Sequence, residues 1–451
     1  MAVVDVEQPG TDPVQPTNGS RRAFLTGAGA AAVAGLAACA GSEVAQLGDA
    51  TPADPTDTTS QANGSQANGS QSSGSEASAA QLEPVGFAGP HQAGVLLPLQ
   101  AAGIVASFDV VTTDRDQLVQ TVQLLSGEIE RIMGDQSIAP RDESLPPADS
   151  GIVDADTGTA GVSVTLAVGA SFFDGRFGLG GVRPTELIEM PRFSNDRLVR
   201  EEMSHGDLSL TITAPDHQRA VFALHQMVRI TERRLRLRWV QEGFNQFLPE
   251  QPGQIAGARN LMGFRDGTSN LDPTDADIMK DFVWVQPGDG EPDWAVGGTY
   301  QATRVIRMLI EFWATAALVR QEQIFGRERD TGAPLGQNAE GDEPSFVSDP
   351  SNDTIPMRSH MRLANPRTPD AARILRRGFS YLNGAATDGT MDQGLLFLCY
   401  QRSLSRGFFE VQTRLDGEPL EDYVKPVGGG LFFVLPGPQE GDWLGQSLFE
   451  S

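Results

Sequence analysis

The order in which apolar segments switch between two spacings constrains the fold of this chain more than any other feature. Between residues 102 and 240, strand-like segments cover 102–111, 162–168, 208–213 and 233–240. Segments whose apolar residues recur at helical spacing cover 114–134 and 216–231. The resulting order is strand, helix, strand, strand, helix, strand. This order predicts a ferredoxin-like βαββαβ unit, in which helices cover one face of an antiparallel sheet.

The second half of the chain contains a similar set of segments. Strand-like segments cover 304–312, 394–400 and 428–436, and helix-like segments cover 315–324 and 406–415. A length of 451 residues with a hydrophobic content of 39% is sufficient for two domain cores. The sequence therefore predicts an α+β protein with two ferredoxin-like domains and antiparallel sheets, the first over 85–245 and the second over 246–451.

The first 84 residues have the composition of an export signal followed by a linker. Ser20-Arg21-Arg22-Ala23-Phe24-Leu25 is a twin-arginine signature, and a weakly apolar run follows over 26–38, so we expect a signal peptide over 1–40. Residues 41–84 are rich in Ser, Gly, Asn, Gln, Thr and Pro, which predicts a disordered linker. The expected location is periplasmic or otherwise extracytoplasmic. Two alternatives stay open at Cys39, since Ala38-Cys39-Ala40 fits an ordinary cleavage site and Leu36-Ala37-Ala38-Cys39 resembles a lipobox for lipid anchoring.

Charge and cysteine content exclude several classes of partner and site. The formal net charge is -25, from 59 acidic and 34 basic residues, and a surface of this sign repels nucleic acid. The two cysteines, Cys39 and Cys399, provide neither a disulfide framework nor a zinc site. After the N-terminus, no stretch is long and apolar enough for a transmembrane span.

The stretch 261–270 in the second half has the residues of a ligand-contacting loop. It places Asp266 between Gly263 and Gly267, and glycine at such positions lets the backbone lie against a flat ligand. Asp-Gly followed by Thr-Ser-Asn is also ordinary turn chemistry. The stretch by itself therefore leaves both a binding site and a simple turn open.

Two further stretches add an imidazole and a guanidinium to this carboxylate. His360 precedes Asn365-Pro366-Arg367, and Arg376 with Arg377 precedes an aromatic strand-like segment. One His, one Asp and one Arg are the side chains that a haem peroxidase site needs. The imidazole binds iron, the carboxylate moves a proton between the peroxide oxygens, and the guanidinium stabilises negative charge as the O–O bond breaks.

Together these motifs resemble the dye-decolourising (DyP-type) peroxidase superfamily. The resemblance is carried by Gly263-Phe-Arg-Asp-Gly-Thr-Ser-Asn270, by His360 with Asn365-Pro366-Arg367, and by Ile374-Leu-Arg-Arg-Gly378. It extends from about Gly89 to the C-terminus and is greatest to the exported deferrochelatase/peroxidase branch, the haem protein of a ferrous-iron uptake system. The resemblance implies two ferredoxin-like domains, with one b-type haem (heme b) per chain in the C-terminal domain.

The resemblance also implies a role for each matching residue. His360 is expected to be the proximal iron ligand, Asp266 the distal acid–base residue and Arg376 the distal arginine, with Arg377 as the alternative. The residues expected to bind the cofactor are Asp266, Gly267, Thr268, His360, Asn365, Pro366, Arg367 and Arg376. Arg367 suits a propionate, because a guanidinium can bind a carboxylate through two hydrogen bonds.

Three further positions complete the expected site. Leu396 and Phe397 are expected to close the distal side of the pocket. A proximal imidazole is usually oriented by an acceptor on its other ring nitrogen, and Asp422 is the candidate for that acceptor.

The function implied by the resemblance is a haem-dependent peroxidase that reduces hydrogen peroxide and oxidises an organic electron donor. The same branch implies a second activity, deferrochelation, in which iron leaves haem while the porphyrin stays intact; this would involve haem as substrate and iron-uptake partners. The alternative is a non-catalytic haem carrier or iron-uptake partner, which Asp266 and Arg376 disfavour because a carrier needs no distal acid and arginine. A homodimer is also expected.

Overall fold

The computed structural model describes residues 82–138, 143–154, 157–246, 258–344, 346–347, 349–368 and 370–451. The predicted signal peptide, Cys39 and nearly all of the predicted linker lie outside these described residues. None of the described helices combines the length and hydropathy that crossing a membrane would require.

The first half forms the predicted βαββαβ unit. Its elements are β1 (Ala102–Val110), α1 (Arg115–Met133), β2 (Ser163–Gly169), β3 (Leu208–Ala214), α2 (His217–Ile230) and β4 (Leu235–Phe244). Both long helices begin where an aspartate caps them: Asp114 accepts a hydrogen bond from the backbone N–H of Gln117, and Asp216 accepts one from that of Arg219. The strands lie in the antiparallel order β2-β3-β1-β4 that a ferredoxin-like unit requires.

The second half repeats this strand order. Its strands are β5 (Thr299–Met308), β6 (Leu375–Arg376), β7 (Phe379–Ala385), β8 (Met391–Gln401) and β9 (Val424–Val434). The four long strands pair in the antiparallel order β9-β5-β8-β7, and the two-residue β6 pairs with β8. The predicted fold class, with two ferredoxin-like units, is therefore confirmed.

Shorter helices connect and flank these strands. The α-helices of the second half are α3 (Ala276–Phe282), α4 (Ile310–Trp313), α5 (Leu318–Phe325), α6 (His360–Ala364), α7 (Phe408–Leu415) and α8 (Gln446–Glu450). The 3-10 helices are η1 (Ala93–Val95), η2 (Ala170–Phe173), η3 (Gly180–Val182), η4 (Glu201–Met203), η5 (Asp293–Ala295) and η6 (Pro419–Asp422).

The predicted bounds of a strand and of a helix in the second half were wrong. The strand predicted over 304–312 begins at Thr299 and ends at Met308, and α4 occupies its last predicted residues. The chain turns there because Trp313 is buried and its indole N–H donates to the Met262 carbonyl at 3.0 Å. The helix predicted over 315–324 starts later, at Leu318, because the turns that close α4 continue to Ala316.

The two halves share one sheet. At one junction β2 pairs with β9, and at the other the pair Phe244 and Ser380 joins β4 to β7. Because β5 also pairs with β8, the strands from β5 round to β8 form a closed ring. Close approach of β9 and β5 requires Gly429, which has φ of 125° and whose hypothetical Cβ would lie 2.0 Å from the Thr303 carbonyl oxygen.

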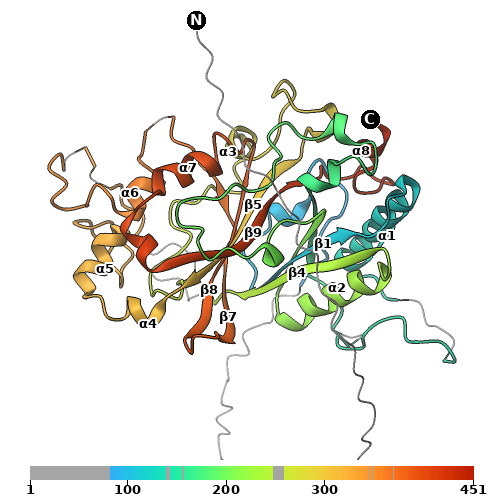
Figure 1. The fold of residues 1–451 in the computed structure, drawn as a ribbon, viewed down its shortest axis with the longest axis horizontal. Coiled ribbons are helices and arrows are strands. Elements are labelled where there is room, and N and C mark those ends of the chain that lie inside the picture. The colour runs from blue at the N-terminus through green and yellow to red at the C-terminus, as the bar shows by residue number, and fades with distance from the viewer. Residues whose placement is uncertain are drawn as a thin grey trace, which may run out of the picture. The chain divides into compact units, whose positions relative to one another are not determined.

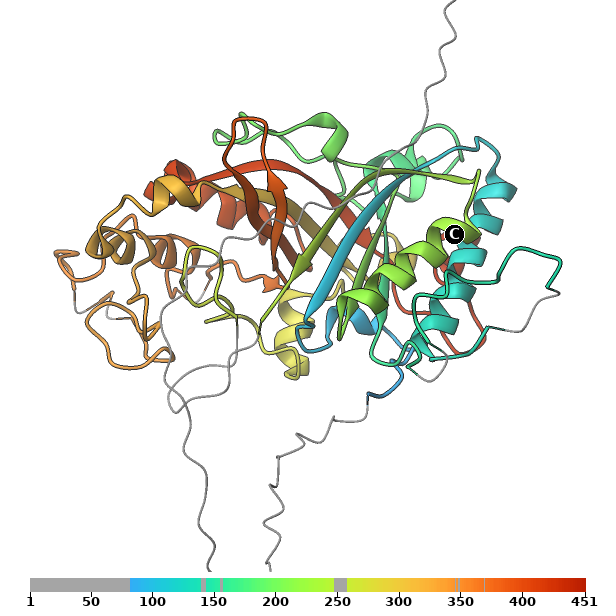
Figure 2. The same cartoon turned by 90° about the horizontal axis from the view of Figure 1, so that it is seen from below.

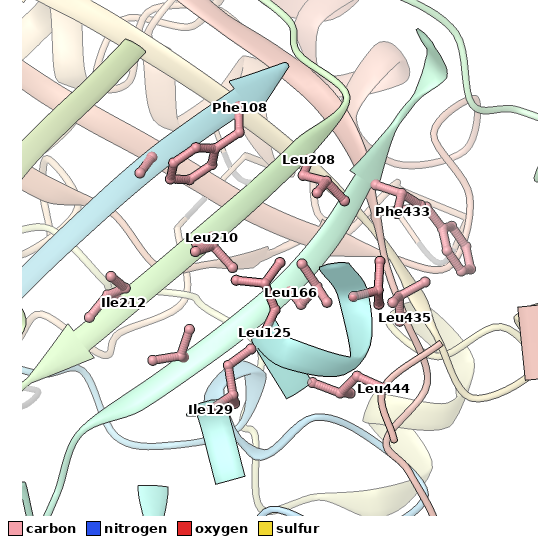
Figure 3. Packing of buried hydrophobic residues seen from close by; sticks show 14 of the residues in the cluster. Phe108, Leu125, Ile129, Leu166, Leu208, Leu210, Ile212, Phe433, Leu435 and Leu444 are labelled. Atoms are coloured by element: carbon pink, nitrogen blue, oxygen red, sulfur yellow. The ribbon is translucent and has the colours of Figure 1, made fainter. Parts of the chain in front are cut away.

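A large apolar core lies between the strands of the first half and the helices α1 and α2. Figure 3 shows side chains from three of its strands facing Leu125 and Ile129 of α1: Phe108 from β1, Leu166 from β2, and Leu208, Leu210 and Ile212 from β3. All seven side chains are at most 2% exposed. Figures 1 and 2 show α1 and α2 beside β1 and β4, whereas α4 to α7 gather at the opposite end of the sheet.

Candidate functional site

A cavity of about 290 Å³ lies in the second half, near the lower end of the range for small-molecule sites. Stretches that are far apart in the sequence line it, and their residues include Asp266, His360 and Arg376. Gly267, Thr268, Asn365 and Arg367 also contribute to its wall. Of the residues predicted to bind a cofactor, Pro366 alone does not line this cavity.

One side of the cavity carries a carboxylate and a guanidinium in contact. Arg376 Nη1 lies 3.2 Å from Asp266 Oδ1, and Arg376 Nη2 donates to the Thr268 carbonyl at 2.9 Å. The same Asp266 oxygen accepts the backbone N–H of Gly267 at 2.8 Å. Both charged side chains are about one-third exposed, at 31% and 33%, so both remain accessible from the cavity.

The neighbouring Arg377 lies outside this site. Its guanidinium donates two hydrogen bonds to the Val95 carbonyl, at 2.7 and 3.1 Å, and is buried. Burial lowers the pKa of Arg377 to about 10, because it disfavours the charged form. Consecutive residues of an extended chain point to opposite faces, so only Arg376 can face Asp266. The geometry thus separates the two arginines that the sequence left as alternatives.

His360 lies at the start of α6 and is held by a carboxylate. Its Nδ1 is 3.0 Å from both Oε1 and Oε2 of Glu418, which is itself only 5% exposed. The predicted acceptor, Asp422, was therefore wrong. Glu418 directly precedes η6, whereas Asp422 ends it. With Nδ1–H donated to Glu418, the neutral ring carries its lone pair on Nε2.

The protonation of His360 depends on two opposing effects. Burial disfavours the imidazolium, but the negative charge of Glu418 and its hydrogen bond favour it more strongly, so the pKa of His360 is raised. The side chain nevertheless remains 33% exposed, because it borders the cavity. Its ring also packs edge-on to Phe325 at 6.1 Å between centroids, which restricts its orientation.

A buried carboxylate supports the Asp266 loop from behind. Glu340 accepts a hydrogen bond from Thr268 Oγ1 at 2.5 Å and lies 3.7 Å from the Arg265 guanidinium. Its backbone carbonyl accepts a hydrogen bond from Arg327 at 3.0 Å. Sequence reasoning did not identify Glu340, because it lies in a loop without any motif and meets Thr268 only in the folded chain.

Strand β8 supplies the apolar wall of the cavity, and the prediction for this wall was only partly correct. Leu395 and Phe397 line the cavity, whereas Leu396 is fully buried in the core on the other face of the strand. The expectation for Phe397 agrees with the structure and that for Leu396 was wrong. The two-residue period of a strand places 395 and 397 together and excludes 396.

Arginines outnumber carboxylates in the lining of the cavity. Its lining includes six arginines, Arg265, Arg304, Arg327, Arg367, Arg373 and Arg376, but only four carboxylates, Asp196, Asp266, Glu418 and Glu421. Three of these arginines are already paired with carboxylates: Arg304 with Asp196, Arg265 with Glu340 at 3.7 Å and Arg367 with Glu343 at 3.4 Å. Arg367 lies at this wall, where it donates to Ser269 Oγ at 2.8 Å.

These residues fit a haem. Within the described ranges, no group of three or more His, Cys, Asp or Glu side chains could hold a bare metal ion. Haem iron needs one protein ligand because the porphyrin supplies the others, and His360 offers one free ring nitrogen. The arginines of the wall match the two carboxylates of the macrocycle.

Comparisons with known proteins match one family to both halves of the chain. The family model described as "Dyp-type peroxidase, N-terminal" matches residues 92–245, and "Dyp-type peroxidase, C-terminal" matches 257–439. A protein named Deferrochelatase from Yersinia pestis bv. Antiqua (strain Nepal516) is 40% identical over 448 residues, covering 98% of this chain and 97% of that protein. The Deferrochelatase of Escherichia coli O6:K15:H31 (strain 536 / UPEC) is 41% identical over 377 residues, covering 82% and 88%.

Solved structures are also similar to this chain over most of its length. Ferric DtpA from Streptomyces lividans superposes with a TM-score of 0.73 at 34% identity, covering 82% of this chain and 98% of that one. A DyP-type peroxidase from Streptomyces coelicolor superposes with a TM-score of 0.74, also at 34% identity and with the same coverage.

Proposed function

The chain belongs to the Dyp-type peroxidase family, and from that premise we propose how its own residues carry out haem-dependent peroxidation. The protein is an enzyme that uses haem to reduce hydrogen peroxide while an organic donor is oxidised. One observation carries the assignment of residues: His360 and the Asp266–Arg376 pair border the same cavity.

His360 is the proposed ligand of the iron. The bond from its Nδ1 to Glu418 fixes the tautomer in which Nε2 is free, and the negative charge of Glu418 makes that nitrogen a stronger donor. Gly267, Thr268, Asn365 and Arg367 are proposed to contact the macrocycle from the cavity wall, with Arg367 or another lining arginine on a propionate. Pro366 would act through the shape of its loop, since it does not line the cavity.

Asp266 and Arg376 are the proposed catalytic pair. When bound, haem supplies an iron that binds peroxide and takes up its oxidising equivalents. The Asp266 carboxylate can accept the proton of the oxygen nearer the iron and return it to the outer oxygen, which then leaves as water. The Arg376 guanidinium, 3.2 Å from Asp266, stabilises the negative charge that develops on the outer oxygen before it is protonated.

Deferrochelation is the second candidate activity. It is favoured by the curated relatives named Deferrochelatase, one of which aligns with 98% of this chain. The substrate would then be haem, and the products would be iron and an intact porphyrin. Incubation of the purified protein with haem, followed by porphyrin fluorescence, tests this activity separately from peroxidation.

Several proposals concern the context of the enzyme. We propose export by the twin-arginine route, supported by Ser20-Arg21-Arg22, with Cys39 as cleavage region or lipid anchor. We further propose that 85–245 and 246–451 are the two domains, that the second binds the haem, that the protein forms a homodimer, and that it works with iron-uptake partners. Mass spectrometry of the mature N-terminus tests the export route, and light scattering tests the homodimer.

The main experiment is an absorption spectrum of the purified protein before and after addition of peroxide. A Soret band that changes on addition of peroxide, together with turnover of a simple dye, is expected. A protein that binds haem and leaves peroxide unchanged would instead support the haem carrier.

A further inference from the structure

Asn270 links the two chain segments that carry the proposed catalytic pair, the Asp266 loop and β6. Its side-chain Nδ2 donates to the Arg376 carbonyl at 2.9 Å, and its Oδ1 accepts the Arg376 backbone N–H at 2.9 Å. The residue lies four positions after Asp266 and is half-buried. Both hydrogen bonds therefore reach the backbone of Arg376, whose side chain contacts Asp266.

These two hydrogen bonds replace a neighbouring strand. The two-residue β6 pairs with β8 on one edge only, where the Arg377 backbone N–H donates to the Leu398 carbonyl at 2.8 Å. In an extended chain, successive backbone groups point to opposite edges, so the N–H and C=O of Arg376 face away from β8. The Asn270 carboxamide presents an N–H donor and a carbonyl acceptor side by side, and these satisfy the backbone carbonyl and N–H of Arg376.

The Asp266 loop is fixed to Arg376 at a second place as well. The Arg376 guanidinium donates to the Thr268 carbonyl at 2.9 Å, and the Asn270 backbone N–H donates to the Gly267 carbonyl at 3.1 Å. The turn from Asp266 to Asn270 is thus closed on itself and attached to both ends of Arg376. Of these contacts, only the Asn270 pair positions the backbone from which the guanidinium extends.

We propose that Asn270 is a positioning residue that sets the register between Asp266 and Arg376, and hence the rate of the peroxide step. The inference rests on the proposed function, in which these two side chains act on bound peroxide. A shift of the β6 backbone by about 1 Å would misplace the guanidinium, and misplacements of this size cost up to about 100-fold in rate. Haem binding should be retained, since His360 and Glu418 are on other segments.

The test uses the haem-loaded enzyme and two variants. Asn270→Ala removes both hydrogen bonds, and the isosteric Asn270→Asp keeps the acceptor but places a second oxygen against the Arg376 carbonyl. Both should slow the stopped-flow change of the Soret band with peroxide by about 10- to 100-fold, with haem content unchanged. The matched control is Asn383→Ala, which removes a carboxamide that also donates and accepts but lies on β7 outside the cavity.

A double-mutant cycle separates positioning from general damage. If Asn270 acts through Arg376, Asn270→Ala should slow the peroxide step no further in the Arg376→Leu background. An equal loss in both backgrounds, or wild-type rates in both haem-loaded Asn270 variants, would overturn the inference. If Asn270→Ala does not fold, the Asp variant carries the same comparison. A wild-type enzyme without any peroxide reaction would instead refute the proposed function.

Discussion

The two halves of the chain share one strand order, but they differ in what covers their sheets. In the first half, α1 and α2, of 19 and 14 residues, cover β2-β3-β1-β4 with apolar side chains. In the second half, the helices in the described part of the connection from β5 to β7 are the short α4, α5 and α6, and α7 in the other connection has 8 residues. The sheet face that a long helix would cover borders the cavity instead.

This difference explains why the site is in the second half. His360 lies in one of these two connections and Glu418 in the other, so their contact at 3.0 Å joins the two connections. Arg376 lies on the two-residue β6, shortly before β7 begins. The repeated fold supplies a rigid sheet, and the irregular connections supply the functional groups.

The strongest test of this comparison replaces one histidine in each half with alanine. His360→Ala should abolish the Soret band of the purified protein, since no other described residue in the cavity lining offers an imidazole. The matched control, His225→Ala on α2, removes an exposed imidazole from the helix-covered half and should leave haem content unchanged. Normal haem ligation in the His360 variant would place the iron ligand elsewhere.

The second test compares one leucine from each half. Leu125 of α1 is fully buried, so Leu125→Ala should destabilise the fold by about 2–5 kcal/mol without changing haem affinity. Leu395 lines the cavity and is only half-buried, so Leu395→Ala should cost less stability. Urea unfolding of the haem-free proteins measures both; equal costs would show that the cavity wall is packed as tightly as the core.

The third test uses adjacent arginines that face different surroundings. Arg376→Leu should slow the peroxide step by about 10²–10³-fold at normal haem content, because a preorganised charge is lost. Arg377→Leu should leave that rate near wild type and lower the free energy of unfolding, since the Val95 carbonyl would lose both hydrogen bonds. Stopped-flow mixing with peroxide and urea unfolding distinguish the two, and the reverse outcome would exchange their roles.

Sequence reasoning predicted the first half better than the second, for a physical reason. Where helices cover a sheet, apolar residues repeat at the helical and strand periods, and 114–134 and 216–231 agree with α1 and α2 to within a few residues. The start of β5 was missed because its buried Gln301 and Thr303 interrupt the apolar pattern. They are tolerated inside because Gln301 donates to Thr303 Oγ1 at 3.0 Å and to Thr211 Oγ1 at 3.2 Å.

The site residues also divide into those that the sequence predicted and those that it missed. Asp266, His360 and Arg376 lie in the motifs that carry the family resemblance, and that resemblance identified them as candidates; all three line the cavity. Glu418 could not be found, because it contacts His360 across 58 residues and the sequence offers another carboxylate, Asp422, four positions later. Asn270 was noticed as a turn residue, but its bonds to Arg376 across 106 residues exist only in the folded chain.

The smallest expected effect concerns the contact between the two connections. Glu418→Gln keeps an acceptor for Nδ1 but removes the charge, so haem affinity at neutral pH should fall by about 10- to 100-fold. Glu418 raises the pKa of His360, and a protonated imidazole cannot bind iron, so protons compete with haem from a higher pH than for an ordinary histidine. Haem affinity falls as the pH is lowered, and in the Gln variant this fall should occur at lower pH. Absorbance titration of the haem-free protein with haem measures it.

The same contact affects the stability of the haem-free wild type. Because the pKa of His360 is raised in the folded state, the contact contributes its whole stabilisation below the unfolded pKa of about 6.5. This stabilisation is lost as the pH rises through the folded-state pKa. Identical pH profiles for the two proteins would mean that Glu418 orients the ring without acting on its charge.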